Sequence, residues 1–190
     1  GSNIDLSGAN FTNTDMSFVF VDGINFTNVN FTNTKSGRLQ VRPSPSGTPP
    51  VFSTPYRVIF STLSGGYIIG PNANLVDANL TDTDISATNL AGVNMTNANL
   101  TNMRSGRLDN TGLTGTTTSP SLPPNYKYVI TSVSGGYIIG PAQNLVGANF
   151  TGADLSFCNF SDSNILDAIF PSDATSLRYV RSGGIPNTSG

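Results

Sequence analysis

The chain has 190 residues, with 9 Lys and Arg against 11 Asp, no histidine and a single cysteine. Charged residues make up 11% of it, and the net charge of −2 provides neither the basic surface of a nucleic-acid binder nor the dense acidity of a nucleic-acid mimic. Without histidine and with one cysteine, the sequence contains no Ser-His or Cys-His nucleophile pair, no internal disulfide and no multi-cysteine metal site.

Large apolar residues recur at every fifth position in three stretches, named run 1 (residues 1–36), run 2 (73–105) and run 3 (143–182). A small or β-branched residue usually stands two places before each of them. Neither a helix nor a strand keeps every fifth side chain on one face, whereas a coil with one corner per five residues does. The predicted core residues are Leu6, Phe11, Met16, Val21, Phe26 and Phe31 in run 1, Leu75, Leu80, Ile85, Leu90, Met95 and Leu100 in run 2, and Leu145, Phe150, Leu155, Phe160, Ile165 and Phe170 in run 3.

Four such sides close a coil of twenty residues, with the large and small apolar residues inside and backbone ladders between coils. The spacing predicts three stacked pairs separated by about 4.8 Å, the usual strand distance. These pairs are Phe11 with Phe31, Leu80 with Leu100, and Phe150 with Phe170. Because each run is shorter than two coils, we expect a run alone to be marginally stable and other elements to cover its open ends.

Residues 37–72 and 106–142 connect the runs, and residues 183–190 begin a third connection that we expect to continue in a longer chain. Each full connection starts with a Pro, Ser, Thr and Gly-rich stretch. It then reads YRVIFSTLSGGYIIGP from Tyr56 or YKYVITSVSGGYIIGP from Tyr126. The β-rich halves around Ser-Gly-Gly predict a β-hairpin. The sequence leaves open whether the connections continue the coil or protrude from it.

Charged residues agree with a twenty-residue coil. Two pairs of an acid and a base are twenty residues apart, namely Asp15 with Lys35 and Asp84 with Arg104. A third pair, Asp154 and Arg181, is separated by 27 residues, and looping out seven residues around the segment FPSDATSL restores the pairing. Exposed ion pairs contribute only about 0–1 kcal/mol, so these pairs serve mainly as markers of register.

The stretches NANLVDANLTDTDISATNLAGVNMTNANLTN and QNLVGANFTGADLSFCNFSDSN resemble the pentapeptide-repeat family, whose pattern is A(D/N)LXX. The resemblance implies an all-β fold of right-handed quadrilateral β-helix segments, here with intervening β-hairpin spacers. Units of a hairpin, a GYxxGP segment and a pentapeptide run are similar to long arrays in bacteria and large DNA viruses. The family implies no activity, because its members range from DNA-mimicking gyrase modulators to proteins without a known function.

Candidate sites for chemistry are few. Cys158 takes the small inward position that Ala fills elsewhere, which predicts a buried, inert thiol. The chain contains no Glu, and most of its Asp residues stand at outward repeat positions that the coil explains. We therefore predict no catalytic residue, no cofactor and no metal site. No apolar run approaches the roughly 20 residues of a membrane span, which predicts no membrane insertion.

These patterns favour a non-enzymatic structural module of a longer β-solenoid array: a spacer, fibre or scaffold at a virion or cell surface. Its expected partners are neighbouring modules of the same chain and, through open solenoid ends, other copies, with no nucleic acid. One alternative is a binding module of the DNA-mimic type that modulates a topoisomerase. A second is an ice-binding face built from outward Thr rows, such as Thr12 with Thr32 and Thr81 with Thr101.

Overall fold

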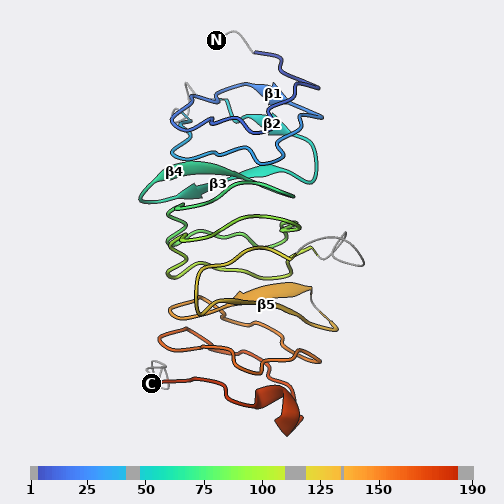
Figure 1. Cartoon of the computed structure of the whole chain (residues 1–190), viewed down its shortest axis with the longest axis vertical. Coiled ribbons are helices and arrows are strands. Elements are labelled where there is room, and N and C mark those ends of the chain that lie inside the picture. The colour runs from blue at the N-terminus through green and yellow to red at the C-terminus, as the bar shows by residue number, and fades with distance from the viewer. Residues whose placement is uncertain (1–3, 42–47, 110–118, 134, 184–190) are drawn as a thin grey trace.

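The computed structural model describes residues 4–41, 48–109, 119–133 and 135–183. Coils are stacked along one long axis, with the first run at one end and the third run at the other (Figure 1). Regular strands are short: β1 (Asn25–Phe26), β2 (Val51–Phe52), β3 (Arg57–Ser61), β4 (Gly65–Ile69), β5 (Lys127–Ile130) and β6 (Gly136–Ile139). One 3₁₀ helix, η1 (Ala174–Leu177), lies near the end of run 3.

Parallel bridges between residues twenty apart hold successive coils together. Asn10 is bridged to Asn30 and Asn79 to Asn99. At each corner the N–H of one residue donates to the carbonyl three places earlier, as from Ala78 to Leu75 at 3.1 Å. The third residue of each turn has a positive φ, for example 57° at Asp77, which is the type II geometry. Four five-residue sides therefore make one coil.

The apolar centres of the three runs form three core clusters, one for each run. In run 2 every predicted core residue is at most 1% exposed. In run 1 the Phe11 and Phe31 rings stack with 6.0 Å between centroids, and in run 3 Phe150 and Phe170 lie 5.5 Å apart. The side chains of Leu6, Phe11, Ile165 and Phe170 are only partly buried, because they lie in the outermost coils.

The two hairpins are antiparallel, and each lies across the long axis as a layer between runs (Figure 1). In β4, Ile68 packs in the run 1 cluster, whereas Tyr67 and Ile69 pack in the run 2 cluster. In β6, Ile138 packs in the run 2 cluster, whereas Tyr137 and Ile139 pack in the run 3 cluster. Since side chains alternate between the faces of a strand, each hairpin closes one core from below and the next from above.

The connections continue the coil before they form the hairpins. After run 1, Gln40 bridges to Phe20, and β2 pairs in parallel with β1. After run 2, Asp109 bridges to Asn89 and Ser121 to Asn94. The sequence left open whether the connections continue the coil or protrude from it. In the structure each connection first adds most of a coil and then forms the hairpin layer.

Each new run stacks directly on the end of the previous one. Lys35 bridges to Asn74, and Arg104 bridges to Asn144. These two contacts, named joint 1 and joint 2, lie in different columns of bridges. The first column contains Asp15, Lys35, Asn74, Asn94 and Ser121, and the second contains Asp84, Arg104, Asn144 and Asn164.

The two joints lie on opposite sides of the long axis. Asn74 and Asp84 are ten residues apart in the same run, which is half of a twenty-residue coil. Run 2 therefore begins in one column and ends in the column across from it. Successive joints, and the hairpins beside them, are related by about half a turn around the axis.

Candidate functional site

The residues at each joint belong to the repeated phrases of the sequence. The segments KSGRL (35–39) and RSGRL (104–108) each contain a buried Ser. The Ser36 Oγ accepts from the Ile68 N–H at 2.9 Å, and the Ser105 Oγ accepts from the Ile138 N–H at 3.0 Å. The Tyr of the SGGY phrase reaches the following run, where the Tyr67 Oη accepts from the Asn79 N–H at 3.1 Å. The repeated phrases thus form the hydrogen bonds that attach a hairpin to the run on each side.

The three charge pairs predicted from register have different outcomes. Asp15 and Lys35 are bridge partners, and so are Asp84 and Arg104. The pairing of Asp154 with Arg181 is wrong, because Arg181 bridges to Asn159 instead. Around η1 the chain absorbs two extra residues rather than seven, so the partner lies 22 residues away. Asp154 forms its ion pair with Lys127 of β5, at 3.9 Å.

Cys158 is 1% exposed and packs in the run 3 cluster, in the small inward position. Burial raises the pKa of its thiol to about 11. A thiol with this pKa is almost entirely protonated at neutral pH, so it is a poor nucleophile and a poor metal ligand.

Neither a metal site nor a membrane span is found in the described residues. No group of three or more His, Cys, Asp or Glu in this part of the chain could hold a metal ion. No helix among the same residues is long and apolar enough to cross a membrane.

One feature of the corners departs from what the coil requires. Corner positions with positive φ are mostly Asn, Asp or Gly, which adopt this left-handed conformation at low cost. Other residue types pay about 1–2 kcal/mol there. In the described part of the pentapeptide corners, the exceptions are Phe18, Arg38, Ala87, Arg107, Ala142, Phe157 and Tyr179.

All of these exceptions except Ala142 form three vertical pairs, which we name corner 1 (Phe18 and Arg38), corner 2 (Ala87 and Arg107) and corner 3 (Phe157 and Tyr179). The backbone N–H of the first member of each pair donates to the residue just before the second member, as from Phe18 to Gly37 at 2.8 Å. One pair of costly corner positions therefore lies in or just after each run, and Ala142 is a further such position just before run 3. The side chains are exposed, with Phe18 at 59%, Phe157 at 72% and Tyr179 at 74%.

At corners 1 and 3 the two side chains of the pair contact each other along the axis. The Arg38 guanidinium lies over the Phe18 ring, 5.4 Å from its centroid. The Phe157 and Tyr179 rings stack with centroids 5.0 Å apart and planes 16° apart. Cation–π and stacked aromatic pairs contribute roughly 0.5–1.5 kcal/mol at exposed sites, so they offset only part of the backbone cost.

The cations of the chain gather at the same three corners. The sequence has nine Lys and Arg, and Arg42 lies outside the described residues. The others are Lys35 and Arg38 at corner 1, Arg57, Arg104 and Arg107 at corner 2, and Lys127, Arg178 and Arg181 at corner 3.

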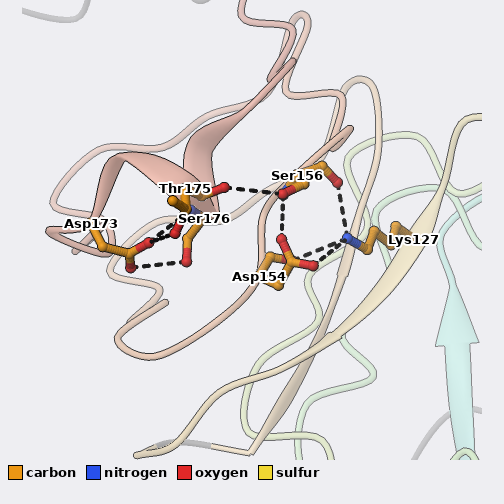
Figure 2. A network of polar contacts seen from close by, with 6 residues as sticks. All are labelled: Lys127, Asp154, Ser156, Asp173, Thr175 and Ser176. Carbon is orange, nitrogen blue, oxygen red and sulfur yellow. Dashed lines mark hydrogen bonds and ion pairs between the residues drawn. The ribbon is translucent and has the colours of Figure 1, made fainter.

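At corners 2 and 3 a base from the hairpin above binds the corner backbone. The Arg57 Nη2 donates to the Ser86 carbonyl at 2.8 Å, and the Lys127 Nζ donates to the Ser156 carbonyl at 2.9 Å. The Ser156 N–H donates to the Asp154 carboxylate at 2.9 Å, next to Lys127 (Figure 2). Hydrogen bonding by Ser156 holds the pKa of Asp154 below its usual range.

Next to the same corner residues, Figure 2 shows a second polar group. The Asp173 carboxylate accepts from the Thr175 hydroxyl at 2.6 Å and from the Ser176 N–H at 2.8 Å, which caps η1. The hydrogen bonds from Thr175 and Ser176 lower the pKa of Asp173 to about 2. The Ser156 hydroxyl donates to the Thr175 carbonyl, which ties η1 to corner 3.

A cavity lies beside each corner. Corners 1 and 2 have equivalent cavities of about 330 and 310 Å³, each lined by two bases, a hairpin Tyr and an Asn of the next run. These residues are Lys35, Arg38, Tyr67 and Asn74 at corner 1, and Arg104, Arg107, Tyr137 and Asn144 at corner 2. The cavity at corner 3 is about 560 Å³ and is lined by Lys127, Phe157, Tyr179 and Arg181 among others.

The corners were not predicted from the sequence, although the sequence contains a signal for them. Aligning the runs gives DMSF, DISA and DLSF from Asp15, Asp84 and Asp154. In this phrase the fourth position is Phe or Ala, whereas most other units place Asn, Asp or Gly there. Attention to outward positions would have found the departure.

Comparison with known proteins gives a match to one family. The model of the pentapeptide repeats matches eight copies over residues 2–35, 72–104 and 143–170, which together make up half of the chain. A search of curated proteins finds no match. Apart from Asn72, the matched stretches fall within the three runs, where the five-residue period, the inward apolar positions and the twenty-residue bridges occur. The chain therefore belongs to the pentapeptide-repeat family.

Proposed function

We propose that the chain is a non-enzymatic structural module of a longer array, which works as a rigid spacer or scaffold. In this proposal the runs form right-handed quadrilateral β-helix segments, and the hairpins are spacers within one continuous solenoid. The observation that carries the proposal is the direct bridging of Lys35 to Asn74 and of Arg104 to Asn144. A coil that continues across its joints transmits force and orientation along the axis.

Two further observations support rigidity. The hairpins contribute apolar side chains to the cores on both sides, so no joint depends on a bare linker. The half-turn relation between joints means that any bend added by one hairpin is opposed by the next. An array of such modules would extend in a straight line, with a length proportional to the number of modules.

Chains in which the module of residues 73–142 is repeated two, four and six times would test the proposal. Small-angle scattering should give a maximum dimension that rises linearly with module number, and electron microscopy should show straight rods. A dimension that grows with the square root of module number would mean freely jointed modules. That result would replace the scaffold by a string of independent domains.

The DNA-mimic alternative predicts inhibition of a topoisomerase. Such a mimic requires a continuous negative surface, whereas this chain gathers its bases at the three corners. A gyrase supercoiling assay separates the two functions. Specific inhibition at modest protein concentration would favour the mimic, and unchanged supercoiling would favour the scaffold.

The ice-binding alternative needs rows of Thr hydroxyls that face water. The Thr12, Thr81 and Thr101 hydroxyls instead donate to the Asn residues two places earlier, at 2.6–2.8 Å. This arrangement fits a role in stiffening the coil edge. It supports the scaffold over an ice-binding face.

A scaffold of this kind would work outside or on the surface of a cell or virion, with neighbouring modules of the same chain as its first partners. Self-association through solenoid ends is a further expectation. Sedimentation of the 190-residue chain over a range of concentrations tests it, because end-to-end association should increase with concentration.

A further inference from the structure

The three corners combine features that folding of the coil does not require. Their left-handed positions hold Phe, Tyr, Arg and Ala where Asn, Asp and Gly stand at most other corners. The large side chains extend into solvent rather than into a core. Residues that are conformationally costly and gain no burial are often retained because they bind something outside the fold.

The bases at the corners supply a second feature. Lys35 and Arg38 line the cavity of corner 1, and Arg104 and Arg107 line that of corner 2. Arg and Lys exposed beside a cavity are suited to bind a carboxylate, with Arg able to form two parallel hydrogen bonds. Each cavity is of a size that accommodates one or two small rings.

The remaining lining groups are uncharged and polar, or aromatic. Asn74 and Tyr67 stand beside the bases at corner 1, and Asn144 and Tyr137 stand there at corner 2. At corner 3 the exposed Phe157 and Tyr179 rings stand beside Lys127 and Arg181. A pyranose ring has an apolar C–H face and a rim of hydroxyl groups, so aromatic rings and amides together suit a sugar.

From these features we propose that the corners bind an acidic polysaccharide, with the aromatic side chains packed on sugar rings and the bases paired with uronate carboxylates. Acids lie nearby at every corner, Asp15 and Asp77 at corner 1, Asp84 at corner 2, and Asp154 and Asp173 at corner 3. The formal net charge of these residues is 0 at corner 1, +2 at corner 2 and +1 at corner 3, so no corner has a strongly positive surface. This suits a ligand with one carboxylate per sugar better than a nucleic acid, which carries a charge about every 1.7 Å of duplex.

The corners are not equivalent as binding sites. Corner 3 has two exposed rings, corner 1 has one ring beneath a guanidinium, and corner 2 has Ala87 in the ring position. We expect affinity to fall in that order. The half-turn between joints places corner 2 on the opposite edge from corner 1, so one array would hold polysaccharide chains on both sides.

Calorimetric titration of the 190-residue chain tests the proposal with four probes: an alginate hexasaccharide, a neutral glucose hexasaccharide, a sulfated heparin hexasaccharide and the oligonucleotide dT₆. The informative variant replaces Phe18, Phe157 and Tyr179 by Asn, a residue that the left-handed position accepts readily. A control variant replaces Phe60 and Leu63 by Asn. These residues are exposed apolar residues of the first hairpin, at 52% and 68%.

We expect the alginate hexasaccharide to bind at least tenfold more tightly than the neutral one, and more tightly than dT₆. The triple variant should bind it at least tenfold more weakly while its Tm is unchanged or higher. The Phe60 and Leu63 variant should keep its affinity. Stronger binding of the heparin fragment than of alginate would retain the anionic-sugar site and identify sulfate as its preferred group.

Several results would overturn the proposal. Equal binding of acidic and neutral hexasaccharides would remove the role of the bases, and tighter binding of dT₆ would identify a nucleic-acid site. Loss of binding together with a clearly lower Tm would assign the rings to folding. A wild-type chain that binds no hexasaccharide, or that dimerises in sedimentation through these same three residues, would also overturn it.

Discussion

Runs 2 and 3 have the same repeat but different surroundings. Run 2 lies between two hairpins, and all its central residues are at most 1% exposed. Run 3 has a hairpin above it, and at its far end it contains η1, with no second hairpin after it in the described residues. There Ile165 and Phe170 are only partly buried. Since the pentapeptide pattern is the same in both runs, the hairpin layers account for the difference in burial.

The comparison shows that the repeat and the hairpin have separate tasks. The repeat decides which side chains point inward, and the hairpin decides whether they are removed from water on both sides. Tyr137 and Ile139 cover run 3 from above, whereas Ile138 on the same strand covers run 2 from below. A single strand thereby contributes to two cores.

The largest expected effect tests this difference in burial with matched substitutions. Ile85→Ala removes a residue that is 0% exposed and should lower the free energy of unfolding by about 2–5 kcal/mol. Ile165→Ala, on the same side of the coil in run 3, should cost only about 1 kcal/mol because Ile165 is already partly in water. Urea denaturation of both variants measures the two values. Equal losses would mean that the hairpin layer does not determine core stability.

The next effect tests the packing between the two ends of the second hairpin. Gly140 follows β6, and a Cβ there would overlap the Tyr126 ring. Gly140→Ala should therefore cost about 1–3 kcal/mol through overpacking. The control is Gly106→Ala, whose Cβ would lie 3.4 Å from the Ser86 Oγ in ordinary contact. Thermal unfolding of the two variants checks the difference, and a Gly140→Ala protein as stable as Gly106→Ala would contradict the close fit.

Much of the fold was readable from the sequence because each repeat unit has a simple physical logic. Phe150 and Phe170 had to stack if a coil contains twenty residues, and Ser-Gly-Gly marked the turn between β3 and β4. The family match confirms the recognition of the repeat. These features depend on local periodicity and turn chemistry, and both can be recognised from the sequence alone.

Other features depend on competition between alternatives of similar energy. The length of the loop after Phe170 could not be deduced from the sequence. With η1 and its Asp173 cap the coil contains two residues more than twenty, whereas looping out the segment as a bulge would have added seven. The ion-pair partner of Asp154 could not be deduced either, because it is Lys127, which lies on a hairpin 27 residues earlier in the chain. The corners were not predicted because residues that face solvent were not expected to be restricted in type by the backbone conformation.

A smaller effect compares two corners with positive φ, one occupied by Ala87 and the other by Gly147. Ala87→Gly should raise the free energy of unfolding by about 0.5–1 kcal/mol, because relief of the left-handed strain exceeds the entropy that Gly adds to the unfolded chain. Gly147→Ala, at a corner with φ of 66° and no atom within 4 Å of the added Cβ, should lower it by a similar amount. Opposite shifts of the urea midpoint are the expected outcome, and shifts of the same sign would contradict strain at corner 2.

The smallest effect concerns the turn that makes run 3 depart from the twenty-residue register. Hydrogen bonds from Thr175 and Ser176 lower the pKa of Asp173 to about 2, against about 3.9 in an unfolded chain. A lowered pKa means that the carboxylate stabilises the fold above pH 4, and that this contribution is lost as the pH falls toward 2. Asp173→Asn should therefore flatten the dependence of Tm on pH between 4 and 2. Thr175→Val, which removes one donor and keeps the carboxylate, should have an intermediate slope, whereas identical slopes in all three proteins would show that η1 opens without affecting the stability of run 3.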